Sequence, residues 1–346
     1  MLMRFEWMTD LSEAQSKMLE DFYFTLPLVH IEQFPRWNNI SKMDVPVSYC
    51  LAWNGNVLEG YAMIYEYKKI LAEIKSGPLA TSPNTSMEII LEAISKYKKR
   101  GFLSLQVLLG MEAGSAATFL QYSVYRKQRF KWSFDKFNKG TLLLKLDDKS
   151  DEQLLKHFSE NHRRAIKKGK KYNLICRKLS TTTEIFQFAD GYSKMFMRRR
   201  IKRSYDKSLK SFISIFEWLK NKNVGFFVGT YEEEKMVGGM LILIRNDRAE
   251  YYSGFTLPDE RKLPIAHLAF YETMKLLKQS GIAYFDFGGF NALVDENDQI
   301  YQINKFKKGF NGDYFFYPPR MYFGLKPLGN KIIRILKAIK ESYTKK

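Results

Sequence analysis

The sequence contains few cysteines and histidines, and this scarcity argues against two kinds of domain. Its 346 residues include two cysteines, Cys50 and Cys176, and four histidines. A secreted disulfide scaffold needs more cysteines, so we expect a cytoplasmic protein in a reducing compartment. The cysteines and histidines show none of the spacings that hold structural zinc, and we expect no metal and no other cofactor.

Long apolar segments are also missing. The longest apolar stretch, Met236 to Ile244, is far shorter than the roughly 20 residues that cross a bilayer. The first ten residues include acids and no apolar core, so no signal peptide is expected. Hydrophobic residues make up 45% and charged residues 27%, which is typical of a folded globular chain and excludes disorder. The length is typical of two domains.

Positive charge is abundant and unevenly distributed. The 56 Lys and Arg exceed the 37 Asp and Glu, which gives a net charge of +19. Basic residues gather in 161–171, 194–210 and the tail 326–346. This pattern favours a polyanionic partner, such as nucleic acid, nucleotide-sugar phosphates or an anionic membrane face. A generally basic, soluble surface is the alternative.

Two stretches, 47–107 and 224–287, repeat one pattern of strand, turn, two strands, helix and strand. Their glycines stay in step: Gly60, Gly77 and Gly101 match Gly238, Gly254 and Gly281 at nearly constant separation. The pattern predicts an α+β protein of two similar domains, each a mixed sheet flanked by helices. We place these domains at 1–149 and 150–325, and a basic amphipathic helix at 326–346.

Two helices are expected at the start of the second domain. Ser150 and Gln153 form a capping box that begins a helix over 151–171, and His162 lies on its apolar face. A second helix over about 184–200 has an apolar stripe that Arg199 continues. An arginine in that position often lines a pocket.

Several segments in this order resemble the FemABX family of non-ribosomal peptidyl transferases. They are GTLLLKL and SENHRRAIKKGKK within 140–171, EYYSGFTLPDERKL at 250–263, YFDFGGF at 284–290 and YQINKFKKGF at 301–310. The resemblance covers roughly residues 25–325. It implies two tandem acetyltransferase-like (GNAT-like) domains in the short FemX-type form, without a coiled-coil arm.

The resemblance also implies an activity. Known members transfer an amino acid from aminoacyl-tRNA to an amine of a peptidoglycan precursor, which is nucleotide- or lipid-linked. Similar proteins are thought to be acyl-CoA-dependent N-acyltransferases of surface sugars. The sequence leaves open a third alternative, a non-catalytic module that binds RNA or membrane.

Aminolysis of an ester needs alignment of the substrates and a donor to the oxyanion, but no protein nucleophile. The segment YFDFGGF ends a strand with Asp286, Gly288 and Gly289. Paired glycines allow a substrate backbone to approach. Asp286 could accept or orient the amine proton, and a capping aspartate is the alternative.

The remaining candidates divide between donor and acceptor. Phe306, Lys307 and Lys308 suit a nucleic-acid end, with the ring on a base and the ammonium groups on phosphates, and Lys307 is also a catalytic candidate. A core phenylalanine with surface lysines is the alternative. Tyr252 and Gly254 lie on the strand expected to line the donor cleft. The candidates for acceptor phosphates are Arg163, Arg164, Lys167, Arg198, Arg199 and, by the family's Gln–Trp–Lys pattern, Lys42.

Ordinary coenzyme A binding is disfavoured. GNAT enzymes hold its pyrophosphate on main-chain N–H groups at a helix N-terminus. Here that place contains Pro264, which has no N–H and is suited to begin the helix. This favours aminoacyl-tRNA as the donor. The tail could contact the inner membrane face, although packing on its own domain is the alternative.

Overall fold

The computed structural model describes residues 3–128, 139–199, 204–257, 263–292, 294–327 and 335. The chain divides into two compact units. Unit 1 contains the described parts of 1–39, 43–139 and 316–346, and unit 2 those of 40–42 and 140–315. The predicted helix at 326–346 lies outside the described residues, apart from 326, 327 and 335.

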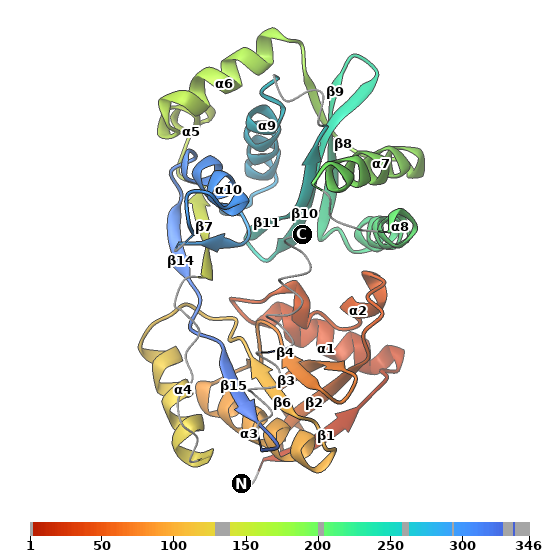
Figure 1. The fold of residues 1–346 in the computed structure, drawn as a ribbon, viewed down its shortest axis with the longest axis vertical. Coiled ribbons are helices and arrows are strands. Elements are labelled where there is room, and N and C mark those ends of the chain that lie inside the picture. The colour runs from red at the N-terminus through yellow and green to blue at the C-terminus, as the bar shows by residue number, and fades with distance from the viewer. Residues whose placement is uncertain are drawn as a thin grey trace. The chain divides into compact units, whose positions relative to one another are not determined.

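Unit 1 is built around a mixed sheet with strand order β1-β2-β3-β4-β6-β15, and β5 pairs with β3 (Figure 1). The strands are β1 (Arg4–Met8), β2 (Val47–Asn54), β3 (Val57–Tyr67), β4 (Leu71–Ile74), β5 (Leu79–Ala80), β6 (Ser104–Val107) and β15 (Met321–Gly324). The helices are α1 (Glu13–Thr25), the 3-10 helix η1 (Ile31–Gln33), α2 (Trp37–Ile40), α3 (Pro83–Lys99) and α4 (Ser115–Gln128). Apolar residues of α3 and α4 pack with the sheet to form its core.

Unit 2 has a second mixed sheet with strand order β13-β7-β12-β11-β10-β9-β8, and β14 pairs with β7. The strands are β7 (Lys139–Lys145), β8 (Ile175–Lys178), β9 (Gly225–Glu232), β10 (Lys235–Arg245), β11 (Arg248–Thr256), β12 (Tyr284–Asp286), β13 (Phe290–Asn291) and β14 (Asp313–Phe316). The helices are α5 (Asp151–His157), α6 (Glu160–Lys171), α7 (Thr182–Arg198), α8 (Tyr205–Lys222), α9 (Ile265–Gln279) and α10 (Gln299–Lys308).

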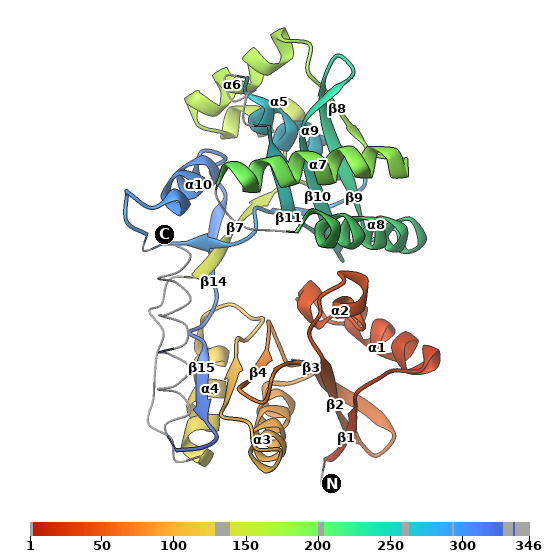
Figure 2. The same ribbon diagram turned by 45° about the vertical axis from the view of Figure 1, so that its right-hand side comes forward.

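Helices α7 and α9 pack on opposite faces of the unit 2 sheet (Figure 2). Adjacent glycines of β10 show this directly, because successive positions of a strand face opposite sides. A Cβ atom at Gly238 would lie 2.6 Å from Ile265 of α9, and one at Gly239 would lie 2.7 Å from Phe188 of α7. Both glycines therefore allow close packing of a helix on the sheet.

The predicted repeat is confirmed in strand order and direction. Strands β2, β3, β4 and β6 match β9, β10, β11 and β12, including the parallel pairing of the last two in each set. A β-bulge lies between Leu58 and Gly60 in β3, and its counterpart lies between Met236 and Gly238 in β10. Gly60 and Gly238 therefore mark one local irregularity that occurs in both units.

The two units do not follow the boundaries expected from the sequence at two strands. Strand β7 lies before residue 150 but completes the sheet of unit 2, antiparallel to β12. Strand β15 lies before residue 326 but completes the sheet of unit 1, antiparallel to β6. Each sheet thus contains a strand from the other predicted domain, which sequence periodicity does not reveal.

The single helix predicted over 151–171 is wrong, because it is two helices. The capping box of Ser150 and Gln153 is present and begins α5. Phe158 then adopts an extended conformation with its side chain in the core, and Ser159 caps a new helix, α6. The helix predicted over 184–200 is confirmed as α7, with Ile185, Phe188 and Tyr192 buried.

Candidate functional site

The sheet of unit 2 opens between β11 and β12. The two strands pair only from Arg248 with Tyr284 to Glu250 with Asp286, although β11 continues to Thr256. Beyond that point Gly288 turns the chain away, with a φ of 68° that favours glycine. A strand that loses its neighbour in this way leaves space beside the sheet.

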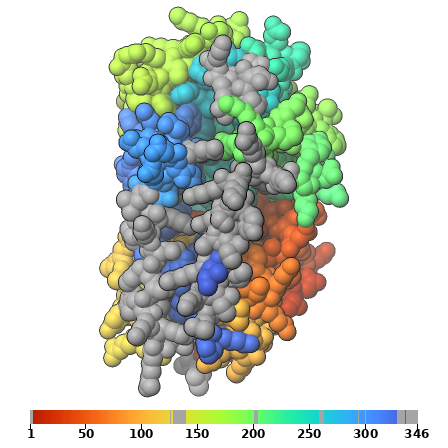
Figure 3. Space-filling view, viewed as in Figure 1, coloured from red at the N-terminus to blue at the C-terminus, as the bar shows by residue number. Residues whose placement is uncertain are grey.

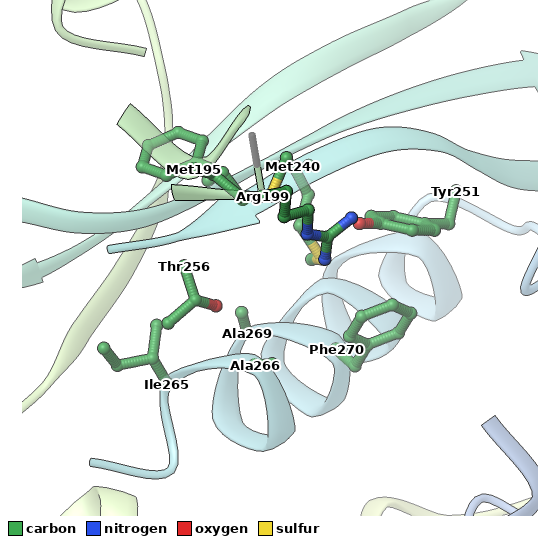
Figure 4. A pocket seen from close by; sticks show the side chains of 12 residues that line it. Met195, Arg199, Met240, Tyr251, Thr256, Ile265, Ala266, Ala269 and Phe270 are labelled. Carbon is green, nitrogen blue, oxygen red and sulfur yellow. The ribbon is translucent and has the colours of Figure 1, made fainter. Parts of the chain in front are cut away.

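A cavity of about 230 Å³ lies at this opening (Figure 4). It is formed by the C-terminal end of α7, by β10 and β11 and by the first turns of α9. The described residues that line it are Met195, Arg199, Gly239, Met240, Tyr251, Gly254, Phe255, Thr256, Ile265, Ala266, Ala269 and Phe270. The predicted position of Arg199 in a pocket is confirmed.

Arg199 and Tyr251 face each other in the cavity, with the guanidinium group directed towards the phenol hydroxyl (Figure 4). Burial raises the pKa of Tyr251 above its ordinary value, and Tyr192 adds to this while Arg199 opposes it. The hydroxyl group therefore stays protonated at neutral pH. It can donate a hydrogen bond into the cavity.

Gly254 keeps the cavity open. A Cβ atom at this position would lie 2.6 Å from the carbonyl oxygen of Gly239 and 2.7 Å from the hydroxyl oxygen of Tyr251. The neighbouring Tyr252 is the extra residue of a β-bulge opposite Leu241 and Ile242, and it is half-exposed. A bulge takes one residue out of the ladder and bends the strand locally, here where β11 lines the cavity.

Lys307 lies beside the same opening. Its ammonium group donates hydrogen bonds to the carbonyl oxygens of Gly288, at 3.1 Å, and Gly289, at 2.7 Å. A Cβ atom at Gly288 would itself lie 2.7 Å from the carbonyl oxygen of Tyr251, so this loop touches the cavity wall. Burial lowers the pKa of Lys307 to about 8, although Asp286 and Glu250 act in the opposite direction.

Asp286 is buried, and both of its carboxylate oxygens accept hydrogen bonds. One carboxylate oxygen accepts from Thr141 and, at 2.8 Å, from the main-chain N–H of Gly288, and the other accepts from Arg248 at 2.9 Å. Burial alone would raise the pKa of Asp286, but Arg248 and these hydrogen bonds outweigh it and hold the pKa below its ordinary value. The carboxylate therefore anchors the turn that presents the carbonyls to Lys307.

Phe306 belongs to an aromatic cluster rather than to an open surface. Its ring centroid lies 4.9 Å from that of His267, 5.3 Å from that of His162 and 5.5 Å from that of Phe270, which lines the cavity. Lys308 is exposed, 5.7 Å from the ring of Phe290, and the α10 segment reaches the surface of unit 2 (Figure 3). Of the FKKGF cations, Lys308 is therefore the one free to meet a phosphate.

The cations predicted to bind acceptor phosphates come from three segments of the chain, namely α6, the end of α7 and the residues after α2. Arg163 donates to the main-chain carbonyls of Phe158 and Lys156, and so braces the break between α5 and α6. Arg164 pairs with Glu160 on the surface of α6, and Lys167 on that helix is exposed. Arg198 is exposed at the end of α7, next to Arg199. Lys42 is exposed after α2, with a φ of 53°.

Helix α9 starts at the proline that was expected to begin it. This proline is the N-cap residue of α9, and it makes no side-chain capping hydrogen bond. In unit 1 the corresponding helix α3 is capped by Ser82, whose hydroxyl accepts from the N–H of Thr85. Pro264 therefore removes one main-chain N–H from the start of α9.

Unit 1 has a different interior at the corresponding position. Tyr61 stands where the repeat places Gly239, is fully buried and donates to the carbonyl oxygen of Gln33 at 2.6 Å. A cavity of about 170 Å³ lies at the start of α3, and its described lining includes no charged side chain. The cavity that combines an arginine with a nearby buried lysine belongs to unit 2.

Sequence reasoning missed Arg248, Thr141 and the pair His162 and His267. The histidines lie with ring centroids 4.6 Å apart against Phe306. Burial lowers both histidine pKa values, that of His267 to about 4, with His162 contributing. They come from α6 and α9, and no spacing in the sequence connects them. Arg248 lies 38 residues from Asp286 and becomes its partner only through the parallel pairing.

Within the described ranges, no group of three His, Cys, Asp or Glu side chains is arranged to hold a metal. No helix that could span a membrane occurs there either.

One family model and several solved structures resemble this chain. Residues 156–305 match the family described as acetyltransferase (GNAT) domain. The structure of FemX shares the fold with a TM-score of 0.75 at 14% identity, over 95% of this chain and 99% of FemX. Together the family match and the fold show a GNAT-type domain in unit 2. None of the curated proteins compared with the sequence matches it.

Two further solved structures share the fold. L-PGS from Bacillus licheniformis has a TM-score of 0.63 at 12% identity, over 93% of this chain and 96% of its own. A tandem GNAT protein from the clavulanic acid biosynthesis pathway has a TM-score of 0.58 at 9% identity, over 94% and 99%. The fold expected from the resemblance to the FemABX family, two tandem GNAT-like domains, is therefore confirmed.

Proposed function

We propose that this protein is an aminoacyltransferase that moves an amino acid from aminoacyl-tRNA to an amine of a cell-wall precursor, nucleotide- or lipid-linked. The observation that carries the proposal is the position of Lys307, buried beside the donor cavity of unit 2 with a pKa lowered to about 8. A group of this pKa is suited to proton transfer near neutral pH. The likeness in fold to FemX supports the cell-wall acceptor.

The geometry of Lys307 suits it to proton transfer. Two of its N–H bonds are directed to the carbonyl oxygens of Gly288 and Gly289. The third position of the nitrogen is a lone pair when the lysine is neutral. That lone pair takes a proton from the acceptor amine as its nitrogen attacks the ester carbon.

The proton that Lys307 has taken from the amine is then passed to the leaving group. An amide bond forms, the ester C–O bond breaks, and the leaving ribose oxygen receives the proton from Lys307. Asp286 keeps the carbonyl turn in place by accepting a hydrogen bond from the main-chain N–H of Gly288. The donor is aligned along β11 at Gly254, where a side chain would close the cavity.

The charged surface supports a nucleic-acid donor and a phosphate-bearing acceptor. Lys308, Arg164 and Lys167 are exposed on α10 and α6. We assign Lys308 to donor phosphates and the α6 cations to acceptor phosphates. The proposed place of action is the cytoplasm or the inner face of the membrane, where such precursors are available.

A second candidate is an acyl-CoA-dependent N-acyltransferase of a surface amino sugar, which the acetyltransferase (GNAT) match favours. The N-cap Pro264 argues against it, because the usual pyrophosphate site lacks an N–H there. A non-catalytic RNA- or membrane-binding module would be favoured by bulky side chains filling the cleft. The open cavity of about 230 Å³ argues against that.

One assay separates these functions. Purified protein is given labelled aminoacyl-tRNA or labelled acyl-CoA with a panel of wall precursors and amino sugars, and the products are scored by mass. Transfer from tRNA alone supports the proposal, and transfer from acyl-CoA alone replaces it with the second candidate. No transfer from either donor would favour the non-catalytic module.

Salt dependence gives an independent test. Binding of a tRNA donor should weaken steeply with salt, and Lys308→Ala should reduce the slope of log K against log [salt] by about 1. Phe306→Ala should weaken binding by about 1–3 kcal/mol if its ring stacks on the terminal base, and not if it only fills the core. Lys98→Ala, an exposed lysine on α3, is the matched control and should leave the slope unchanged.

A further inference from the structure

Arg199 gives the donor cavity a positive charge, and no counter-ion for it occurs among the described residues that line the cavity. Among the described residues that line the cavity, it is the one charged side chain. None of the described carboxylates forms an ion pair with it. Most of the other lining side chains are apolar, including Met195, Met240 and Phe270. A cation against such a lining is best stabilised by an anionic ligand.

Hydrogen-bond donors inside the cavity point to the same conclusion. The protonated hydroxyl of Tyr251 faces the Arg199 guanidinium, and the hydroxyl of Thr256 also lines the space (Figure 4). A guanidinium fork with a phenol hydroxyl beside it matches the two oxygens of a carboxylate. No described lining residue offers a carboxylate to a cationic side chain.

We propose that Arg199 selects the transferred group, and that the cavity takes an acyl group ending in a carboxylate, such as glutamyl or aspartyl, in preference to neutral or cationic groups. The inference rests on the proposed function, because it assigns the cavity to the donor's acyl group. It moves Arg199 from the acceptor phosphates, where sequence reasoning placed it, to the donor. The carboxylate that pairs with Arg199 belongs to the transferred acyl group, so this negative charge leaves the cavity with the product.

The test compares glutamyl-, alanyl- and lysyl-tRNA under identical conditions. The wild-type protein should use the glutamyl donor with a kcat/KM about 10-fold above alanyl and about 100-fold above lysyl. Arg199→Gln should remove the preference of glutamyl over alanyl, and Arg199→Lys should restore part of it. Arg199→Glu should favour the lysyl donor.

Lys194→Gln is the matched control. This lysine lies on the same helix, is exposed and pairs with Asp190, so the donor ratios should not change. Thermal melting of each variant checks that it is folded. Donor ratios also remain interpretable when total activity falls, because they compare substrates on one protein.

Equal use of alanyl and glutamyl donors by the wild type would overturn the inference. So would unchanged ratios in Arg199→Gln, or a loss confined to acceptor affinity. If no aminoacyl-tRNA is used, the proposed function fails, and succinyl-CoA against acetyl-CoA then tests the inference separately. A preference for succinyl-CoA that Arg199→Gln removes would support it, and equal use would overturn it.

Discussion

His162 donates a hydrogen bond from Nε2 to the main-chain carbonyl of Phe306 at 2.8 Å. A carbonyl only accepts, so the proton lies on Nε2, and Nδ1 then accepts from the hydroxyl of Ser159 at 3.2 Å. The contact joins α6 to the turn of α10 that carries Lys307. It also explains Gly309, where a Cβ atom would lie 2.0 Å from the imidazole.

Replacing His162 should therefore loosen the turn that positions Lys307. We expect His162→Ala to lower the free energy of unfolding by about 2–4 kcal/mol, from lost packing and a carbonyl left without its donor. His162→Gln should recover part of this, because an amide can donate to the same carbonyl. Chemical denaturation measures both. Lys171→Ala, exposed at the end of α6, is the control, and an equal loss in it would refute the explanation.

The neighbouring pair of His162, which is buried, and His267, which is partly buried, should make the protein sensitive to acid. The pKa of His267 is about 4 in the folded protein, because burial and His162 oppose its charge, against an ordinary value near 6.5. The unfolded chain then binds more protons between pH 6.5 and 4, so stability is lost as the pH falls through that window.

The expected loss from His267 is on the order of 3 kcal/mol. Denaturation curves at pH 7 and pH 4.5 measure it. His267→Phe should lose less stability over this interval than the wild type. An identical pH dependence in the two proteins would contradict the assignment.

Asp286 should contribute to the stability of the fold mainly through its ion pair with Arg248. The Asp286→Asn change leaves a buried guanidinium without its counter-ion, and we expect a loss of about 3–5 kcal/mol in unfolding free energy. The exposed pair of Asp190 and Lys194 is the comparison, and Asp190→Asn should cost less than about 1 kcal/mol. A stable Asp286→Asn protein that is nevertheless inactive would instead make Asp286 the proton acceptor.

The proposed role of Lys307 predicts the shape of the pH–rate profile. Because a neutral amine is the active form, kcat/KM should rise with pH and level off above about 8. Lys307→Arg keeps the charge but does not lose its proton, so it should lower the rate by about 100-fold or more and flatten this limb. A rate that falls above pH 8 in the wild type would show that the ammonium form acts.

Gly254→Ala should close the donor cavity while the fold persists. Its Cβ atom would collide with the Gly239 carbonyl and the Tyr251 hydroxyl, so donor binding should weaken by about 10-fold or more. Gly114→Ala is the control, because a Cβ atom there meets nothing within 4 Å. Titration measures the donor affinity of both variants. Equal affinities would show that the donor binds elsewhere.

Local features of this protein were determined by its sequence. The periodicity and paired glycines predicted the repeat, since a bulge and a helix end each demand the same residue in both copies. Capping residues predicted the start of α5, because a side-chain oxygen there satisfies main-chain N–H groups. The apolar stripe of α7 predicted that Arg199 would reach a cavity, because side chains three residues apart share a helix face.

Tertiary structure alone decided the site. Parallel pairing of β11 with β12 brings Arg248 to Asp286, and the opening beyond that pair creates the cavity. The charge state of Lys307 follows from its burial, which a sequence pattern does not reveal. The exchange of β7 and β15 between the two sheets likewise depends on long-range hydrogen bonding. Burial and strand pairing act between residues distant in sequence, and they decided which charged side chains are paired and which one lines the cavity.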